Sequence, residues 1–572
     1  MARTVREIER KYETASGAAP LDLAGLSALA ELPGVASVAD RGVRVLDATY
    51  YDTADRRLAA DGVTLRRRTG GPDEGWHLKL PVRPKGAPRA SGGNVVRDEI
   101  RAPLGDAIPP ELAGLTRSRT LDAPLAPLVV LHTRRAVWHL LDAAGEPLAE
   151  ISADEVSARR AGRDGDPVHW SEVEVELATG HDTTLLDAVE AHLATLGLRP
   201  ARATSKLARA LEQTAAPPPT AAEPAPEPLA PATQAHREER RAVPDGSGKK
   251  PKKARRRQGA DALLGGGDPA ADPRAGDVVL DAVRRQVAAI VALDPAVRRE
   301  APDAVHQMRV ATRRLRSVLR SYRTVVARSA TDPVGAELRW LAAELGVDRD
   351  REVLAERLLA ALDAIPAEQR LGPVRARLRI WSHAQHADAR RRLTEVLDGP
   401  RHLALLTTLD GLRADPPRVG ADTPLLRPAA TRPPRKVVRA AVLREVDRLA
   451  RRVEEALALS PGPERDTALH AARKAAKRAR YAAEAAELGL GVAARELADR
   501  LQEVQRLLGD HQDSVMARAA LRGIALRAHA AGESTFTLGL LYGREEAVAA
   551  ARERELPELW ARLAEGPVRE LL

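Results

Sequence analysis

The chain has 572 residues, too many for one hydrophobic core, so we expect at least two domains. Its formal net charge of +10 favours polyanionic partners such as nucleic acid, phosphate polymers or an anionic membrane surface. The absence of cysteine excludes disulfides, thiolate metal sites and cysteine nucleophiles, and no apolar run approaches ~20 residues, so we expect a cytoplasmic protein without a membrane span.

The first strand-like segment, 5–12, carries charged residues at every second position: Glu7, Glu9 and Lys11. Side chains two residues apart on a β-strand point to the same side. Two carboxylates and an ammonium group therefore share one face. Such an arrangement of like charges indicates that a ligand of opposite charge lies between them.

Alternating segments separated by Gly, Pro and Asp turns continue to about residue 178, at 43–51, 63–69, 76–81, 95–102, 128–141, 147–160 and 169–178. Helical patterns occur at 21–32, 184–196 and 204–213. The two-residue spacing of charge recurs in acidic and basic versions, at Glu172/Glu174/Glu176, Arg66/Arg68 and Arg97/Arg101. We therefore predict an antiparallel α+β domain whose eight strands close into a barrel, with a charged, wet interior suited to a polyanion and metal ions.

A change of composition near Thr214 predicts a linker. The segment from there to about Ala275 holds 11 of the 41 prolines, the basic run 249–257 and the glycine triplet 265–267. With so few apolar residues it cannot bury a core, so we expect a disordered or extended linker at 213–275. The basic run is explained equally well as a solvated tether or as a loose polyanion contact.

From the linker to the end of the chain the pattern is helical, with a period of 3.6 residues. We expect a break at each of several prolines: Pro302, Pro333, Pro366, Pro373, Pro400, Pro433, Pro434 and Pro463. The sequence therefore predicts an all-α second domain over 276–572.

An internal repeat divides this helical half. His306 and His470 are each followed by a basic residue at +3, +7, +8 and +10, and a second pair of matching segments follows at 345–350 and 508–513. Two matches in the same order and at nearly the same offset indicate duplication of a helical bundle, over about 276–415 and 430–572.

Helical geometry groups the repeated residues. Positions 0, +3, +7 and +10 fall within roughly 80° of arc, so each histidine and three basic residues form one stripe. Residues 304–328 hold seven arginines and no acid. A phosphate polymer would neutralise such a stripe through multidentate arginine contacts. Two simpler explanations stay open: a solvated arginine-rich face, and histidines that belong to the core.

The first domain, 1–212, resembles the CYTH family, also called triphosphate tunnel metalloenzymes. The resemblance rests on the ordered motifs Glu7-x-Glu9-x-Lys11, Tyr50-Tyr51-Asp52-Thr53, Leu65-Arg66-Arg67-Arg68, Leu78-Lys79-Leu80-Pro81, Arg97-Asp98-Glu99-Ile100, Glu150…Asp154, Glu172-x-Glu174-x-Glu176 and Ser205-Lys206. It implies cations that hold a triphosphate: Lys11, Arg66, Arg68, Lys79, Arg97, Lys206 and one arginine of the strand around 131–135, either Arg134 or Arg135, with Arg135 as the candidate. It also implies carboxylates on the metal side: Glu7, Glu9, Glu150, Asp154, Glu172, Glu174 and Glu176. The catalytic candidates are Glu7, Glu9 and Lys11.

The second domain, 276–572, resembles CHAD, the conserved-histidine α-helical domain. That family is associated with binding inorganic polyphosphate through basic helices around its histidines. The resemblance implies the following polyphosphate-binding residues: His306, Arg309, Arg313, Arg314, Arg316, His470, Arg473, Lys477, Arg478 and Arg480.

Together these features predict a triphosphatase that depends on Mg²⁺ or Mn²⁺ and is tethered to a polyphosphate-binding module. The alternative is a non-catalytic polyphosphate-binding protein associated with polyphosphate granules. Nucleic-acid binding is less favoured, because aromatic residues, on which single strands stack, make up 2% of the chain. Inorganic triphosphate, thiamine triphosphate, ATP and RNA 5′ ends all stay open as substrates.

Overall fold

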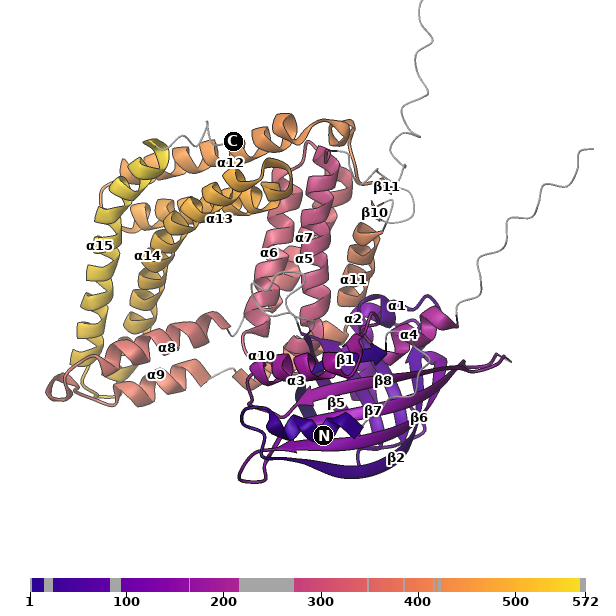
Figure 1. Cartoon of the computed structure of the whole chain (residues 1–572). Coiled ribbons are helices and arrows are strands. Elements are labelled where there is room, and N and C mark those ends of the chain that lie inside the picture. The colour runs from indigo at the N-terminus through magenta and orange to yellow at the C-terminus, as the bar shows by residue number, and fades with distance from the viewer. Residues whose placement is uncertain are drawn as a thin grey trace, which may run out of the picture. The chain divides into compact units, whose positions relative to one another are not determined.

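The computed structural model describes residues 3–14, 24–82, 94–163, 165–214, 272–346, 349–383, 386–414, 417–419 and 423–565 (Figure 1). The chain forms two compact units, Met1–Gln258 and Gly259–Leu572, which we describe separately. Nearly all of the predicted linker, 213–275, lies outside the described residues.

The first unit is a closed antiparallel barrel, as predicted. Its sheet order is β5-β4-β3-β2-β6-β7-β8-β1, and β1 also pairs with β5, which closes the ring. A short strand, β9, extends β1 beyond its pairing with β8. The strands are β1 (Arg3–Thr14), β2 (Ser37–Asp52), β3 (Thr64–Thr69), β4 (Gly75–Pro81), β5 (Val95–Ala102), β6 (Ala126–Leu141), β7 (Pro147–Arg160), β8 (Val168–Leu177) and β9 (Leu198–Pro200).

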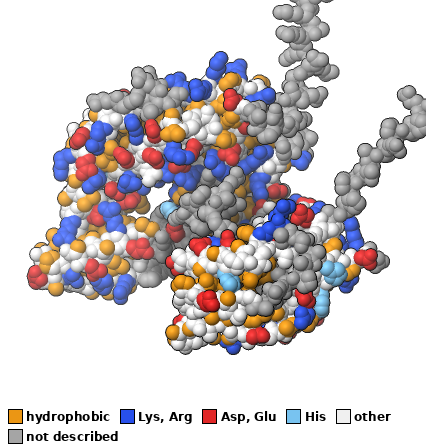
Figure 2. Space-filling model, in the orientation of Figure 1, with side chains coloured by type: hydrophobic (Ala, Val, Ile, Leu, Met, Phe, Trp, Pro, Cys, Tyr) orange, Lys and Arg blue, Asp and Glu red, His pale blue; other side chains and the backbone are white. Residues whose placement is uncertain are grey.

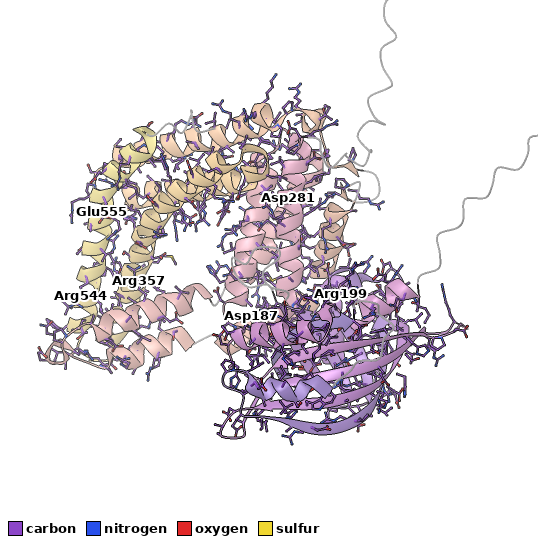
Figure 3. All side chains as sticks on the ribbon, in the orientation of Figure 1. Asp187, Arg199, Asp281, Arg357, Arg544 and Glu555 are labelled. Carbon is purple, nitrogen blue, oxygen red and sulfur yellow. The ribbon has the colours of Figure 1, made fainter. Side chains whose placement is uncertain are left out.

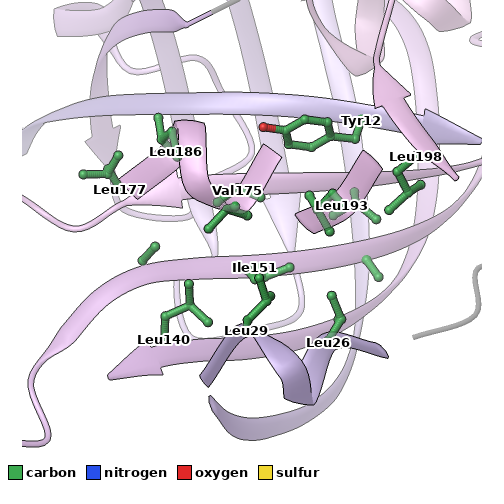
Figure 4. Packing of buried hydrophobic residues seen from close by; sticks show 14 of the residues in the cluster. Tyr12, Leu26, Leu29, Leu140, Ile151, Val175, Leu177, Leu186, Leu193 and Leu198 are labelled. Carbon is green, nitrogen blue, oxygen red and sulfur yellow. The ribbon is translucent and has the colours of Figure 1, made fainter. Parts of the chain in front are cut away.

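Short helices accompany the barrel, and a hydrophobic core lies under two of them. Val173, Val175 and Leu177 of β8 are buried in a cluster that includes residues of the neighbouring strands and helices (Figure 4). The alternate residues of β8, Glu172, Glu174 and Glu176, therefore face the barrel interior. The helices are η1 (Ala24–Glu31), α1 (Arg57–Ala60), α2 (Pro110–Thr120), α3 (Thr184–Thr195) and α4 (Lys206–Gln213), of which α1 and α2 were not predicted.

The second unit is helical throughout most of its described length. Its helices are α5 (Ala275–Arg298), α6 (Ala304–Ser321), α7 (Arg328–Glu344), α8 (Arg349–Asp363), α9 (Val374–His383), α10 (His386–Asp398), α11 (Pro400–Arg413), α12 (Pro434–Leu457), α13 (Pro463–Leu490), α14 (Val492–Ala530) and α15 (Phe536–Glu565). The predicted breaks at the prolines are observed with one exception. Pro333 lies inside α7, where the burial of Ala330, Val334 and Leu338 outweighs the backbone bond that the proline removes.

The two copies of the repeat correspond in their first helices. The helices α5 and α12 have 24 residues each and precede α6 and α13, which carry the two histidines. A β-carbon added to Gly346 would lie 3.1 Å from a guanidinium nitrogen of Arg309, and one added to Gly509 would lie 3.5 Å from the equivalent Arg473. The same glycine–arginine contact in both halves supports the predicted duplication. The copies differ at this glycine. The helix α7 ends at Glu344, before Gly346, whereas α14, which has 39 residues, includes Gly509.

Candidate functional site

The barrel encloses a charged cavity of about 390 Å³, which we call the barrel cavity. Its lining includes every predicted barrel site residue except Asp154 and Glu172, which are buried beneath it. The cationic lining residues are Lys11, Arg44, Arg66, Arg68, Lys79, Arg97, Arg101, Arg135 and Lys206, and the acidic ones are Glu7, Glu9, Asp73, Glu99, Glu150, Glu174 and Glu176.

Strand register explains why these side chains meet. Glu9 pairs in register with Glu176, and Glu176 in turn pairs with Glu150 on its other side. Lys11 lies opposite Glu174, and Glu7 opposite Arg97. Since one parity faces inward on each strand, the acidic residues of β1, β7 and β8 form one patch across three neighbouring strands.

The two arginines left open by the sequence have different environments. Arg135 lines the barrel cavity with 17% of its side chain exposed and donates to Asp154 over 2.7 Å and to Glu174 over 2.8 Å. The Arg134 side chain is 56% exposed and its nearest carboxylate is Glu155, which is also exposed. The structure therefore places Arg135, and not Arg134, at the cavity.

Lys206 holds the deepest carboxylates together. Its ammonium group lies 2.8 Å from both Asp154 and Glu172 and 2.7 Å from Glu174. Lys206 is the first residue of α4, whose N-cap hydroxyl, from Ser205, accepts a hydrogen bond from the backbone N–H of Ala208. Helix capping thus fixes the position from which this lysine enters the barrel.

At another part of the wall, Glu99 is the centre of an ion-pair network that the sequence analysis did not assign to the site. It lies 3.6 Å from Arg66 and 3.7 Å from Lys79, and its carboxylate accepts from His77 over 2.9 Å. Glu99 and Arg101 lie two and four residues after Arg97 on β5, so the same alternation places all three side chains on the inner face of the strand. Arg44 and Tyr50 share an inward parity on β2 in the same way.

Burial and neighbouring charges set the protonation of the acidic patch. Burial raises the pKa of Glu7 to about 7 despite the opposing effect of Lys79, and burial also raises the pKa of Glu176. Burial opposes ionisation of Glu9 too, but its cationic neighbours, Lys11 first among them, outweigh that effect and hold its pKa well below the usual range. Burial lowers the pKa of Lys11 to about 8.

The carboxylates fit a hard divalent cation. Oxygen atoms of Asp154, Glu172 and Glu174 lie within 4.8 Å of one another, and oxygen donors suit Mg²⁺ and Mn²⁺. The ammonium group of Lys206 contacts all three, so an ion could bind there once this lysine turned away. Glu7, Glu9, Glu150 and Glu176 offer further oxygen donors in the cavity wall.

The helical unit contains a second charged cavity, of about 850 Å³, which we call the central helical cavity. Most of the predicted polyphosphate-binding residues line it: His306, Arg309, Arg313, Arg316, His470, Arg473, Lys477 and Arg478. Arg314 and Arg480 do not, because both reach Glu484, over 3.2 and 2.7 Å, and lie over the ring of Tyr481. Four further cationic residues line the cavity without having been predicted: Arg320, Arg357, Arg452 and Lys474.

Basic side chains outnumber acidic ones in the described lining of this cavity, although carboxylates outside the lining pair with Arg357, Arg452 and Arg478. Among the described lining residues one carboxylate, Asp513, faces ten Arg and Lys side chains. Arg357, labelled in Figure 3, bonds Glu545 over 2.7 Å and Ser514 over 3.0 Å. Burial, followed by the nearby Arg473 and Arg313, lowers the pKa of Lys477 to about 8. The ammonium group of Lys477 is therefore repelled by these neighbouring guanidinium groups.

Comparison with known proteins identifies the two units. Residues 6–210 match the CYTH domain and residues 281–522 match the CHAD domain, so the chain belongs to the proteins that join a CYTH domain to a CHAD domain. CYTH tunnel proteins are metal-dependent. Within the described residues, no helix combines the length and apolar character needed to cross a membrane.

Among its relatives are two Mycobacterium tuberculosis proteins, MT2285 of strain CDC 1551 / Oshkosh and Rv2226 of strain ATCC 25618 / H37Rv. Each is 36% identical over 582 residues, which cover 99% of this chain and 97% of the relative.

Solved structures are similar to parts of the chain. PptA from Streptomyces chartreusis is 20% identical, covering 50% of this chain and 99% of its own, with a TM-score of 0.42. The CHAD domain from Ricinus communis is 24% identical, covering 51% and 93%, with a TM-score of 0.40. HpAC1 from Hippeastrum, a candidate adenylyl cyclase described as having a dominant triphosphatase activity, is 19% identical, covering 37% and 98%, with a TM-score of 0.22.

Proposed function

We propose that the barrel hydrolyses inorganic triphosphate, or a closely related triphosphate, with Mg²⁺ or Mn²⁺, and that the helical unit binds polyphosphate. The observation that carries the proposal is the barrel cavity itself, in which nine cationic side chains surround a patch of carboxylates inside a closed ring of strands. A small ligand with several negative charges, accompanied by a metal ion, would neutralise both sets at once.

The residues of the barrel have separable parts in this proposal. Arg66, Arg68 and Arg135 would bind phosphate oxygens and hold the chain in line, which is most of what phosphoryl transfer requires of a protein. Lys11 and Lys206 bond carboxylates in the structure and would turn to phosphate when the metal binds those carboxylates. The metal, when bound, polarises a phosphoryl oxygen and lowers the pKa of a water molecule.

Glu7 is suited to receive a proton. Its pKa of about 7 lies near neutral pH, where a general base works most efficiently. Glu9, kept ionised by its cationic neighbours, would instead serve as a permanent negative charge and metal ligand. The two carboxylates of the same strand thus have different tasks because their surroundings differ.

Among its described residues, the lining of the central helical cavity has one carboxylate, Asp513, in place of the carboxylate patch of the barrel, and we therefore propose that this unit binds the polymer. Its cationic lining would hold a phosphate polymer, and association with polyphosphate granules in the cytoplasm would follow from that binding. Inorganic polyphosphate has no nucleobases that would stack on aromatic side chains, so the scarcity of aromatic residues does not disfavour its binding.

A phosphate-release screen tests the enzymatic part. Inorganic triphosphate, polyphosphate, thiamine triphosphate, ATP and RNA with a 5′ triphosphate are each offered with Mg²⁺ or Mn²⁺. We expect release from inorganic triphosphate to exceed the others, to stop with EDTA and to return when metal is restored. Tight binding of triphosphate without release under any of these conditions would favour the non-catalytic alternative.

A further inference from the structure

Two smaller arginine-lined cavities adjoin the central helical cavity. One, of about 350 Å³, is lined by Arg448, Arg451, Arg452 and Glu455 of α12 together with Arg320 and Arg478, and we call it the α12 cavity. The other, of about 280 Å³, lies between α6 and α7, and we call it the α7 cavity; its cationic lining residues are Arg316, Arg320, Arg323, Arg328 and Arg339.

Shared side chains make the three cavities neighbours. Arg320 lines all three. Arg452 and Arg478 line both the central helical cavity and the α12 cavity, and Arg316 lines both the central helical cavity and the α7 cavity. A polyanion held in the central helical cavity would thus find arginines at the beginning of each smaller cavity.

Carboxylates neutralise only part of this charge. Arg452 pairs with Glu455 over 2.6 Å, and Arg328 with Asp332 over 2.9 Å. Glu445 is buried between two arginines, 3.6 Å from Arg448 and 3.9 Å from Arg478. The remaining lining arginines, Arg316, Arg320, Arg323, Arg339 and Arg451, have no carboxylate within ion-pair distance among the described residues.

The arginines also destabilise one another's charge. Burial, then Arg339 and Arg320, lowers the pKa of Arg316. Burial likewise lowers the pKa of Arg478, and Arg448, Arg320 and Arg452 lower it further against the opposing effect of Glu445. On the visible face of the helical unit, Lys and Arg side chains are interspersed with Asp and Glu side chains (Figure 2). Repulsion that persists across neighbouring helices is relieved by a ligand that spans them.

We infer that the α12 cavity and the α7 cavity extend the polyphosphate site, so that a long chain leaves the central helical cavity past Arg320 and is held along α12 or α7. This inference rests on the proposed polyphosphate binding and adds to it a dependence on chain length. Tripolyphosphate, which has three phosphates, would occupy the central helical cavity alone, whereas a long polymer would gain the additional arginine contacts.

The test uses the full chain in EDTA, in a background with Arg66→Ala and Arg68→Ala that weakens anion binding by the barrel. Arg448→Ala and Arg451→Ala together remove two cationic residues that line the α12 cavity and neither of the other two. Arg435→Ala and Lys436→Ala are the matched control, because both residues are exposed, lie on the same helix and line none of the three cavities. Arg323→Ala with Arg339→Ala tests the α7 cavity in the same way.

Titration calorimetry then compares tripolyphosphate with long-chain polyphosphate. We expect the α12 pair of substitutions to weaken long-chain binding by about tenfold and to make its salt dependence shallower, while tripolyphosphate binding stays within about twofold of the background. The control pair should bind both ligands as the background does.

Two results would overturn the inference while leaving polyphosphate binding intact. One is long-chain affinity unchanged in both the α12 pair and the α7 pair. The other is an equal loss for tripolyphosphate and the long chain, which would mean that the substitutions had damaged the central helical cavity. If the background protein binds neither ligand, the proposed polyphosphate function fails and the extension fails with it.

Discussion

At the scale of single residues, the barrel separates inward from outward charge by strand parity. Arg134 and Arg135 illustrate this, since adjacent positions on β6 lie on opposite faces of the same wall. Arg135 donates to Asp154 and Glu174 in the interior, and Arg134 reaches the exposed Glu155. Position within the strand therefore decides which arginine side chain lines the barrel cavity.

Arg135→Ala should lower kcat/KM for inorganic triphosphate by about tenfold or more, because it removes a cationic contact and leaves two buried carboxylates with fewer partners. Arg134→Ala is the matched control and should retain wild-type kinetics within about twofold, as expected for an exposed ion pair. Steady-state phosphate release by the two variants checks this. Equal losses in both would mean that the assignment by parity is wrong.

Lys477 gives a prediction about stability. Its folded-state pKa, about 8, lies below the ordinary value of 10.5, so the folded protein favours the neutral form of this side chain. The contribution of Lys477 to the free energy of unfolding is therefore retained above the pKa that this lysine has in the unfolded chain, and it is lost as the pH falls through about 8. At about pH 7 the ionised lysine therefore lowers the free energy of unfolding.

Lys477→Met should accordingly raise the free energy of unfolding of the helical unit by about 1–2 kcal/mol near pH 7, and by less above about pH 10. Denaturant titration at the two pH values measures the effect. Lys474→Met, at an exposed position of the same cavity, should change stability little. The account of Lys477 is wrong if its substitution destabilises the protein at neutral pH.

At the scale of elements, α6 and α13 present equivalent stripes to one cavity. Each places its histidine and the basic residues at +3 and +7 in the lining. The correspondence between the two copies extends to Gly346 and Gly509, which lie close to the guanidinium groups of Arg309 and Arg473. Two helices related by the repeat thus place histidine and basic side chains at equivalent positions in the lining of one cavity.

Replacing two basic residues in each stripe, with Arg309→Ala, Arg313→Ala, Arg473→Ala and Lys477→Ala, should weaken binding of long-chain polyphosphate by well over tenfold, since several charge-assisted contacts of about 1.5–3 kcal/mol each are lost. The control carries Arg435→Ala, Lys436→Ala, Arg522→Ala and Arg527→Ala at exposed positions outside the cavity. Measuring the affinity for long-chain polyphosphate at several salt concentrations distinguishes the stripe variant from the control variant. Wild-type affinity in the stripe variant would mean that the stripes are solvated faces.

The helices and strands could be predicted from the sequence where the hydrophobic residues recur with a clear period, and less well where tertiary packing determines the structure. The strands and the charged parity of β1, β3, β5 and β8 follow from alternation of residue types. The helix α2 was missed because its hydrophobic pattern is weak, and the break at Pro333 was wrong because tertiary packing maintains α7. Arg314 and Arg480 follow the repeat, but their shared partner Glu484, on α13, is a tertiary contact for Arg314 that spacing cannot show.

At the scale of the whole molecule, two units with different chemistry share one chain. In the barrel, acidic and basic side chains together line a cavity of about 390 Å³. In the helical unit, mainly basic side chains line a cavity of about 850 Å³. The family and the class of each fold could be predicted from motif order. Which arginines of α12 and α7 join the basic surface could not, because they come together only when distant helices pack.

Limited proteolysis tests the proposed domain boundaries. Cleavage within 213–275 should leave two stable fragments near 1–212 and 276–572, because the proline-rich and basic composition of that segment cannot form a core. Mass spectrometry of the products identifies the cut sites. A digestion that yields no stable fragment on either side would show that the boundaries are misplaced.

The central claim is that the charges of β1 catalyse triphosphate hydrolysis. Its most direct test is the rate of phosphate release from inorganic triphosphate, with Mg²⁺ or Mn²⁺, by the wild type, Glu9→Gln and Lys11→Ala. Because each substitution removes a largely buried charge from the cavity and none from the hydrophobic core, we predict folded variants whose rates fall by about a hundredfold or more. Rates within about twofold of the wild type in both variants would contradict the account.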